Sequence, residues 1–435
     1  MASSGLDVFI TNVLMDISKF LDVESTVRLS QTCRTLHESL TDDPNSRYPK
    51  IKVSHFSIGD PSMWRDEDGN RLPSIATSGG RITSLSTHVL PKIHFPSLKR
   101  LEFRFPPGKV FANGDDELRG LFVNLAIGLE TATNLEEFHI DIGVVMKFDT
   151  FNSSMIYEVF AKNLAKCTQL RRLKVFNRLL VRGGQSYYSV GFLRALVPAI
   201  ERGVLMLEEV TLLIGNSPIM ASSSNRAYIN ATRDLFAAIL RLRRLKEFNL
   251  QLNLASSPLL NEFLQVCEHL YRTSGTLPSE SVEKFMVMSV LYKVPEGVPN
   301  PLPAPLSLAP CLALLNESSN LQAFVVRVPS ACWDSNSISE LKNVLSAKPM
   351  LRHLGLYFHG YECTSGRTLE YVLDYIQERE MCPDNLIHVS GLECCNTRFD
   401  EEEALERYHS REGQKCLSWD ENGLLFQAKG YMVGW

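Results

Sequence analysis

The residues with the clearest potential for chemistry are cysteines and histidines near the C-terminal end of the chain. Thiolate sulfur and imidazole nitrogen are usual ligands of zinc, and this group comprises His359, Cys363, Cys382, His388, Cys394 and Cys395. Zinc sites commonly draw on Cys-x-x-Cys pairs, which this segment lacks, and the adjacent Cys394 and Cys395 cannot easily chelate one tetrahedral ion. We therefore expect buried thiols here and no metal site.

Motifs of known catalysis are missing from the sequence. There is no Gly-x-Ser-x-Gly nucleophile, no phosphate-binding Gly-x-x-x-x-Gly-Lys loop and no His-Glu-x-x-His zinc motif. The segment 66–69 is similar to part of a calcium-binding loop, but its glycine comes too early and no glutamate closes the loop. We expect a polar turn there, and a non-catalytic protein without a cofactor.

The composition indicates a large hydrophobic core. The chain has 435 residues, 44% of them hydrophobic, and a formal net charge of −4. We expect more than one domain, and neither nucleic acid nor a membrane as a partner. Because the N-terminus shows no secretory signal pattern, the ten scattered cysteines should stay reduced, which predicts a cytoplasmic or nuclear location.

An apolar-x-x-apolar-x-apolar signature recurs along the chain at a nearly fixed interval. Its eight copies begin at Leu98, Leu135, Leu170, Leu207, Leu245, Val282, Leu321 and Leu351. Subtracting successive positions gives steps of 37, 35, 37, 38, 37, 39 and 30 residues. Such self-similarity indicates that one supersecondary unit is stacked. A ninth copy, at 386–389, breaks at Gly391.

A helical pattern precedes the signatures. Leu118, Leu121 and Leu125, for example, fall on one helical face, whereas Pro198 should kink or shorten the helix in which it lies. Each unit is thus a helix, a loop and a short strand. We expect an α/β fold, a right-handed solenoid whose parallel inner sheet is covered by outer helices and curves into a horseshoe.

This signature resembles that of the leucine-rich-repeat family in its long β/α form. On that resemblance we assign 97–395 to a solenoid of 8–9 repeats. Residues 46–96, which include a strand-like run at 51–58, are assigned to a linker and N-terminal cap. Residues 396–435 are assigned to a C-terminal cap with a hairpin turn at 420–423.

The first forty-five residues carry a different pattern. Val13, Ile17 and Leu21 fall on one face of a short amphipathic helix, a break is expected at 22–24, and a second helix should run from Thr26 to Leu40. So few residues cannot bury their own apolar faces. We expect this segment to pack on a neighbouring domain or on a partner.

The helix–break–helix pattern resembles the F-box, on the Phe20-Leu21-Asp22 and Cys33-Arg34-Thr35-Leu36 elements, although Phe9-Ile10 stands where the family usually has Leu-Pro. We therefore assign 6–45 to a small all-α F-box-like domain. The resemblance implies that it docks the small adaptor protein of an SCF-type cullin ubiquitin ligase. The docking residues would be Phe9, Ile10, Val13, Ile17, Leu21, Val27 and Leu29.

The side chains between the apolar positions of each signature should face the concave side of the solenoid, because strand side chains alternate. At the first of these positions Arg100, Glu137, Arg172 and Glu209 alternate in charge, which predicts cross-strand pairs that set the register. Further along, apolar residues occupy positions that should be exposed to solvent, namely Phe176, Leu213, Met286, Met288, Val325 and Tyr357. They predict a target-binding surface; alternatively, the C-terminal cap or a long loop folds over them.

Together the two resemblances imply a substrate-recognition adaptor of an SCF-type ubiquitin ligase, whose repeat surface holds a target protein. The alternative is a leucine-rich-repeat scaffold that is not associated with ubiquitin ligases and whose N-terminal helices merely cap the solenoid. The missing Leu-Pro favours that alternative. Fold-level analogy carries both interpretations.

Overall fold

The computed structural model divides into two compact units, Met1–Glu208 and Glu209–Trp435, which are described separately below. The structure describes residues 13, 23–32, 34–58, 90–103, 114–141, 153–177, 181–182, 185–186, 190–203, 206–215, 223–253, 257–279, 281–290, 306–316, 318–329, 332–347, 351, 353–359, 386–390, 415–420 and 423–428.

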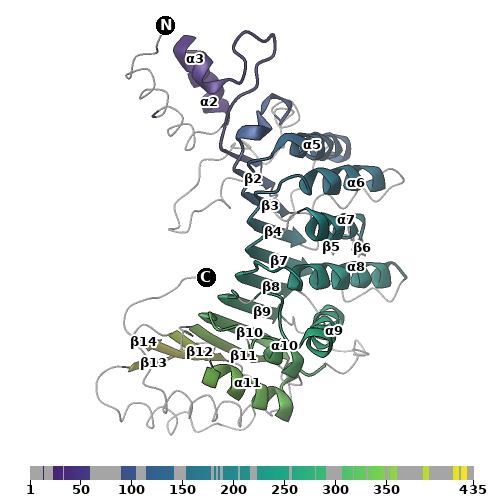
Figure 1. Ribbon diagram of the computed structural model, residues 1–435, viewed down its shortest axis with the longest axis vertical. Coiled ribbons are helices and arrows are strands. Elements are labelled where there is room, and N and C mark those ends of the chain that lie inside the picture. The colour runs from purple at the N-terminus through teal and green to yellow at the C-terminus, as the bar shows by residue number, and fades with distance from the viewer. Residues whose placement is uncertain are drawn as a thin grey trace. The chain divides into compact units, whose positions relative to one another are not determined.

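In the first unit, parallel strands are joined through helices that lie together beside the sheet (Figure 1). The strands, in chain order and in sheet order, are β1 (His55–Ile58), β2 (Arg100–Phe103), β3 (Glu137–Asp141) and β4 (Arg172–Asn177). The helices are α5 (Gly114–Gly128), α6 (Ser153–Leu164) and α7 (Val190–Arg202), with single 3₁₀ turns at η3 (Leu90–Lys92), η4 (Phe95–Ser97) and η5 (Leu129–Thr131). A small antiparallel pair, β5 (Val181–Arg182) and β6 (Gln185–Ser186), precedes α7.

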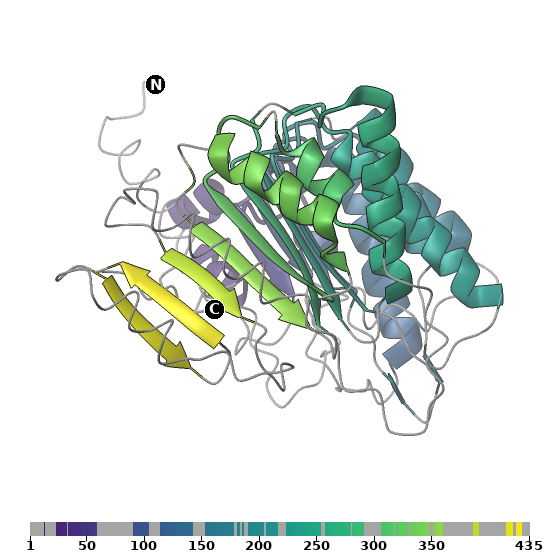
Figure 2. The same ribbon diagram turned by 90° about the horizontal axis from the view of Figure 1, so that it is seen from below.

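The second unit repeats this plan and ends in a hairpin. Its parallel strands are β7 (Glu209–Gly215), β8 (Glu247–Asn253), β9 (Lys284–Val290), β10 (Ala323–Pro329), β11 (His353–His359) and β12 (Leu386–Ser390). The hairpin predicted at 420–423 is present, since β13 (Lys415–Asp420) pairs antiparallel with β14 (Gly423–Ala428), which in turn pairs with β12. The helices α8 (Ser223–Leu240), α9 (Ser257–Ser274), α10 (Ala309–Leu314) and α11 (Ser335–Ala347) cover one face of the sheet (Figure 2).

The apolar positions of the repeated signature form the core of both units. In the first unit Leu101 pairs in register with Phe138 and Phe138 with Leu173, and all three side chains are fully buried. In the second unit Phe248, Phe285 and Phe324 occupy the same register position of neighbouring strands and are also buried. Equivalent residues of successive repeats therefore lie side by side, which confirms the expected stacking of an α/β unit on a parallel sheet.

Backbone hydrogen bonds tie each repeat to the one before it at the start of its strand. The amide of Glu136 donates to the carbonyl of Lys99 at 2.7 Å, and the amide of Arg171 donates to the carbonyl of Glu136 at 2.8 Å. In the second unit the amide of Gln322 likewise donates to the carbonyl of Glu283 at 2.7 Å. These bonds join residues about one sequence period apart, so the repeat length seen in the sequence is also the step of the sheet.

Aromatic rings fill the space between sheet and helices in the first unit. Phe122 of α5 and Phe160 of α6 stack with ring centroids 5.3 Å apart, and Phe160 lies equally close to Phe192 of α7. Phe138 of β3 packs on Phe160 from the sheet side, with centroids 5.9 Å apart. Because rings of this size dominate the apolar area removed from water, they hold α5, α6 and α7 at fixed distances from the strands.

Two expectations about helices are corrected by the structure. Of the two effects expected of Pro198, a kink or a shorter helix, the shortening is absent, because α7 runs through it from Val190 to Arg202; proline removes one helical hydrogen bond, and the buried Ala195 and Ala199 still anchor the helix on both sides of it. The helix expected over 26–40 is divided into α2 (Val23–Ser30) and α3 (Arg34–Leu40), and the predicted break at 22–24 overlaps the start of α2.

Candidate protein-binding faces

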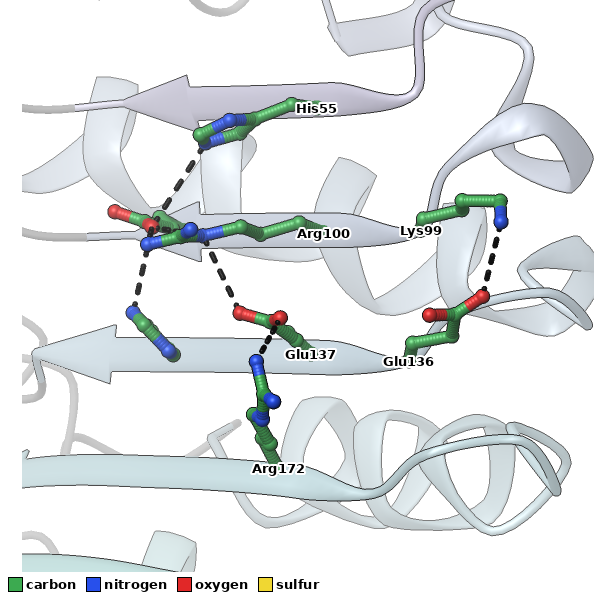
Figure 3. Close-up of polar contacts among 8 residues, drawn as sticks. His55, Lys99, Arg100, Glu136, Glu137 and Arg172 are labelled. Atoms are coloured by element: carbon green, nitrogen blue, oxygen red, sulfur yellow. Dashed lines mark hydrogen bonds and ion pairs between the residues drawn. The ribbon is translucent and has the colours of Figure 1, made fainter. Parts of the chain in front are cut away.

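A ladder of opposite charges crosses the strands of the first unit, as the alternation in the sequence predicted. Arg100, Glu137 and Arg172 occupy one register position of β2, β3 and β4, and Figure 3 shows their side chains on the same face of the sheet. Glu137 Oε1 lies 2.7 Å from Arg172 Nη1, and its Oε2 lies 3.5 Å from Arg100 Nε. A second, more exposed pair joins Lys99 Nζ to Glu136 Oε1 at 3.1 Å.

The ladder is weaker in the second unit. Lys284 of β9 pairs with Glu247 of β8, with Nζ and Oε1 2.6 Å apart, but Glu247 lies opposite Glu209 of β7 in the register. Like charges in facing positions destabilise a sheet slightly. The charge pattern therefore specifies the register in the first unit more strongly than in the second.

A buried polar cluster lies next to the ladder on β1, β2 and β3. Its centre is Glu102, whose side chain is only 1% exposed. Arg100 Nε and Nη2 both lie 2.5 Å from Glu102 Oε1, His139 Nδ1 lies 3.4 Å from it and His55 Nε2 lies 3.8 Å from it. A buried carboxylate is costly unless a cation or donors surround it, and here Arg100 supplies the cation while His139 is the nearer of the two histidines.

The histidine on β1 is neutral at pH 7. Burial lowers the pKa of His55 to about 4, and the cation of Arg100 lowers it as well. Arg100, and not His55, therefore supplies positive charge beside Glu102. This arrangement balances charge and fixes side chains at the edge of the sheet, and we assign it a structural role.

The strand-like run predicted at 51–58 is present as β1, but it was assigned to a linker and cap, so the place of His55 in this cluster was not predicted. The run also carries the repeated signature. Val53, Phe56 and Ile58 repeat the apolar-x-x-apolar-x-apolar signature, and Val53 and Phe56 are 1% exposed. The signature begins 45 residues before that of Leu98, a longer step than any other, so the periodicity alone did not reveal it.

Part of the predicted apolar surface is present in the second unit. Leu213 of β7 and Met286 and Met288 of β9 are half-buried, so part of each side chain is open to solvent. Gln251 separates Leu213 from Met288 in the register, so Leu213 is not continuous with the two methionines. The apolar surface is accordingly smaller than the sequence suggested.

Val325 does not belong to the exposed part of this surface. It lies opposite Met286 in the register, yet its side chain is only 1% exposed. The neighbouring Phe324 and Val326 are fully buried too, so both faces of β10 are closed to water at this point. Alternation along a strand assigns a residue to a face, but it does not say whether that face is covered.

Phe176 of β4 and Tyr357 of β11 lie at the predicted strand positions, and their side chains are outside the described part.

The predicted docking residues at the N-terminus are described only in part. Val13 exposes 39% of its surface. Leu29 lies half-buried on α2, and Val27 lies on the same helix with its side chain outside the described part. Phe9, Ile10, Ile17 and Leu21 fall outside the described residues.

Four cysteines whose side chains are described behave as core residues. Cys167, Cys267, Cys311 and Cys332 are buried free thiols. Burial raises the pKa of Cys167 and of Cys332 to about 12, so neither is a nucleophile near neutral pH. The cysteines of the zinc candidate, Cys363, Cys382, Cys394 and Cys395, lie outside the described residues.

Among the described residues, no group of three or more histidine, cysteine or acidic side chains could hold a metal ion. None of the described helices combines the length and the apolar character needed to cross a membrane.

No family model matches the sequence, and no curated protein matches it. The assignment of a function therefore rests on the residues and on the geometry given above.

Proposed function

We propose that this chain is a non-catalytic substrate receptor of an SCF-type ubiquitin ligase. Its N-terminal helices would dock the small adaptor protein of the ligase, and its repeat surface would hold the target protein for ubiquitin transfer. The catalytic work would then belong to other subunits. In this proposal the solenoid is a leucine-rich-repeat domain and the segment 6–45 is an F-box.

One observation carries the proposal, namely the in-register stacking of helix–strand repeats with one apolar face buried and the other partly open. The signature residues of each repeat, such as Phe248, Phe285 and Phe324, are buried in the core. The alternate positions, such as Met286 and Met288, are then left for other contacts. Repeat proteins use such extended surfaces to recognise other proteins.

The N-terminal segment supports the ligase half of the proposal. Helices α2 and α3 are 8 and 7 residues long, too short to be stable without packing. Ahead of them Val13 is exposed on the side predicted to carry Ile17 and Leu21. A short helix with an exposed apolar face is what docking onto a partner requires.

A second function deserves a test because Phe9-Ile10 replaces the Leu-Pro that usually opens an F-box. In that case the chain is a protein-interaction scaffold outside ubiquitin ligases. Its repeat surface would have the same use, but no cullin adaptor would bind.

Affinity purification from a eukaryotic extract separates the two. The wild-type chain should recover a cullin adaptor, and the variant Ile17→Asp with Leu21→Asp should not. Ser18→Asp is the matched control, because Ser18 falls off the predicted apolar face. Recovery of no adaptor by wild type would leave only the scaffold function.

The target-binding surface is tested in the same extract. Met286→Glu with Met288→Glu should remove proteins that wild type recovers while leaving the adaptor bound. Arg226→Glu on α8 changes the charge by the same amount at an exposed position of the helix layer. If the double methionine variant recovered the same proteins as this control, the repeat surface would not be the target site.

A further inference from the structure

A groove of about 580 Å³ lies between α6 and α7 in the helix layer of the first unit. Its floor is apolar, because the buried Ala161, Ala195 and Ala199 carry only methyl groups and the buried Tyr157 lines it with them. The volume is within the range of sites that hold a ligand or a few side chains of a partner. It is separate from the strand face to which target binding is assigned above.

Close approach of the two repeats at one end leaves this space between the helices. A Cβ atom added to Gly203, just after α7, would come within 2.1 Å of the carbonyl oxygen of Ala165, just after α6. Glycine at this position therefore allows the helix ends to meet. Further along, alanines on both helices are too small to fill the volume between them, which is left as a groove.

The rim of the groove is mainly positive. Lys162 of α6 and Arg194 and Arg202 of α7 are exposed and line it, against one carboxylate, Glu158. Within the part of the chain that the structure describes, none of these three cations forms an ion pair with a carboxylate of the protein. Most charged ladder residues of the same unit, such as Arg172, do have such partners. The rim thus offers two arginines without an ion-pair partner among the described residues, and a lysine that also lies near Glu130, above an apolar floor.

We propose that this groove binds an acidic amphipathic helix of a partner protein. Arg194 and Arg202 are eight residues apart on α7, which places them about 12 Å apart along the helix axis. Two carboxylates seven or eight residues apart on a docked helix have the same spacing, and an apolar side chain midway between them would enter the alanine floor. A nucleic acid or a membrane surface would use the cations but not the apolar floor. This site goes beyond the proposed function, since neither the docking helices nor the strand surface takes part.

A synthetic helical peptide tests the proposal. The probe is a fluorescein-labelled peptide with two glutamates eight residues apart and a leucine midway between them, and the comparison peptide has glutamine at both glutamate positions. Fluorescence anisotropy with the full chain should show saturable binding of the first peptide, and at least tenfold weaker binding of the second. Arg194→Glu with Arg202→Glu should also weaken binding of the first peptide at least tenfold.

A charge-matched variant outside the groove shows whether any loss of peptide binding is specific to the groove. Arg241→Glu with Arg243→Glu changes the charge equally at exposed positions that do not line the groove, and it should bind the peptide as wild type does. Circular dichroism checks that each variant is folded. If the groove variant does not fold, wild-type binding must still weaken as salt is raised, because the predicted contacts are ionic.

Three results would overturn the proposal. These are no saturable binding to wild type, equal binding to the groove variant and to wild type, and equal binding of the two peptides. Sedimentation velocity tests whether a second copy of this chain, and not a partner helix, occupies the groove. If wild type self-associates and the groove variant is monomeric, a second copy of this chain fills the groove and the proposed partner helix is wrong.

Discussion

Arg100 Nε lies 2.5 Å from Glu102 Oε1, two residues further along the same strand, and the Glu102 side chain is almost completely buried. Alternation places both residues on the strand face that repeat proteins usually present to partners. The Arg100 side chain is 32% exposed, so it keeps contact with water while it neutralises a carboxylate that is closed to water. This part of the sheet face is therefore stabilised internally, and we place target binding further along the repeats.

Removing Arg100 should destabilise the protein strongly. Arg100→Ala leaves Glu102 without its closest cation, and breaking a buried pair by deleting one partner costs on the order of 3 kcal/mol. Lys99→Ala is the matched control, because the exposed pair of Lys99 with Glu136 contributes less than about 1 kcal/mol. Urea denaturation of the three proteins measures both changes. Equal losses from the two variants would show that the Glu102 cluster contributes nothing special.

Stability should fall with acidification through His55. Because burial lowers the pKa of His55 from 6.5 to about 4, the unfolded chain takes up a proton at this side chain at a higher pH than the folded chain does. Folding is therefore penalised progressively as the pH falls from 6.5 to about 4, by on the order of 3 kcal/mol at the lower limit.

His55→Gln should flatten this part of the profile. The free energy of unfolding, measured by urea denaturation between pH 7 and pH 4, should fall less steeply in the variant than in wild type. His269→Gln, at an exposed position of α9, should leave the slope unchanged. Identical slopes for wild type and His55→Gln would show that His55 protonates in the folded protein near its ordinary pKa.

Two glycines on the same helix should respond to alanine in opposite directions. A Cβ on Gly128, at the end of α5, would lie 2.1 Å from the ring of the buried Phe95, whereas one on Gly120 would meet nothing within 4 Å. Gly120→Ala should raise the free energy of unfolding by about 0.5–1 kcal/mol, because it reduces the freedom of the unfolded chain. Gly128→Ala should lower it by about 1–3 kcal/mol, the usual cost of overpacking. Thermal unfolding followed by circular dichroism tests the pair, and a stabilised Gly128→Ala would show that Phe95 moves aside freely.

Residues that repeat in the sequence could be placed well in advance. Leu101, Phe138 and Leu173 recur at one period, and such a pattern is satisfied only if they stack into a common core, so both their burial and their register follow from spacing. The charges of Arg100, Glu137 and Arg172 follow the same period, and their pairing was predictable for the same reason.

Features that depend on what covers a surface were not predictable. Met286 and Val325 are equivalent in the sequence pattern, yet only Val325 is closed to water. Periodicity fixes the direction of a side chain but not the neighbours that reach it from other parts of the chain. The groove between α6 and α7 was missed because it arises from the small size of Ala161 and Ala195, and small size leaves no periodic signal.

The central claim, that the N-terminal helices dock the small adaptor of a cullin ligase, is tested most directly by calorimetric titration of the purified full chain with the purified adaptor. We predict saturable one-to-one binding by wild type, at least tenfold weaker binding by Val13→Asp, whose site is exposed in the structure, and unchanged binding by Ser18→Asp. No heat of binding with wild type, or equal affinity for wild type and Val13→Asp, would contradict the claim.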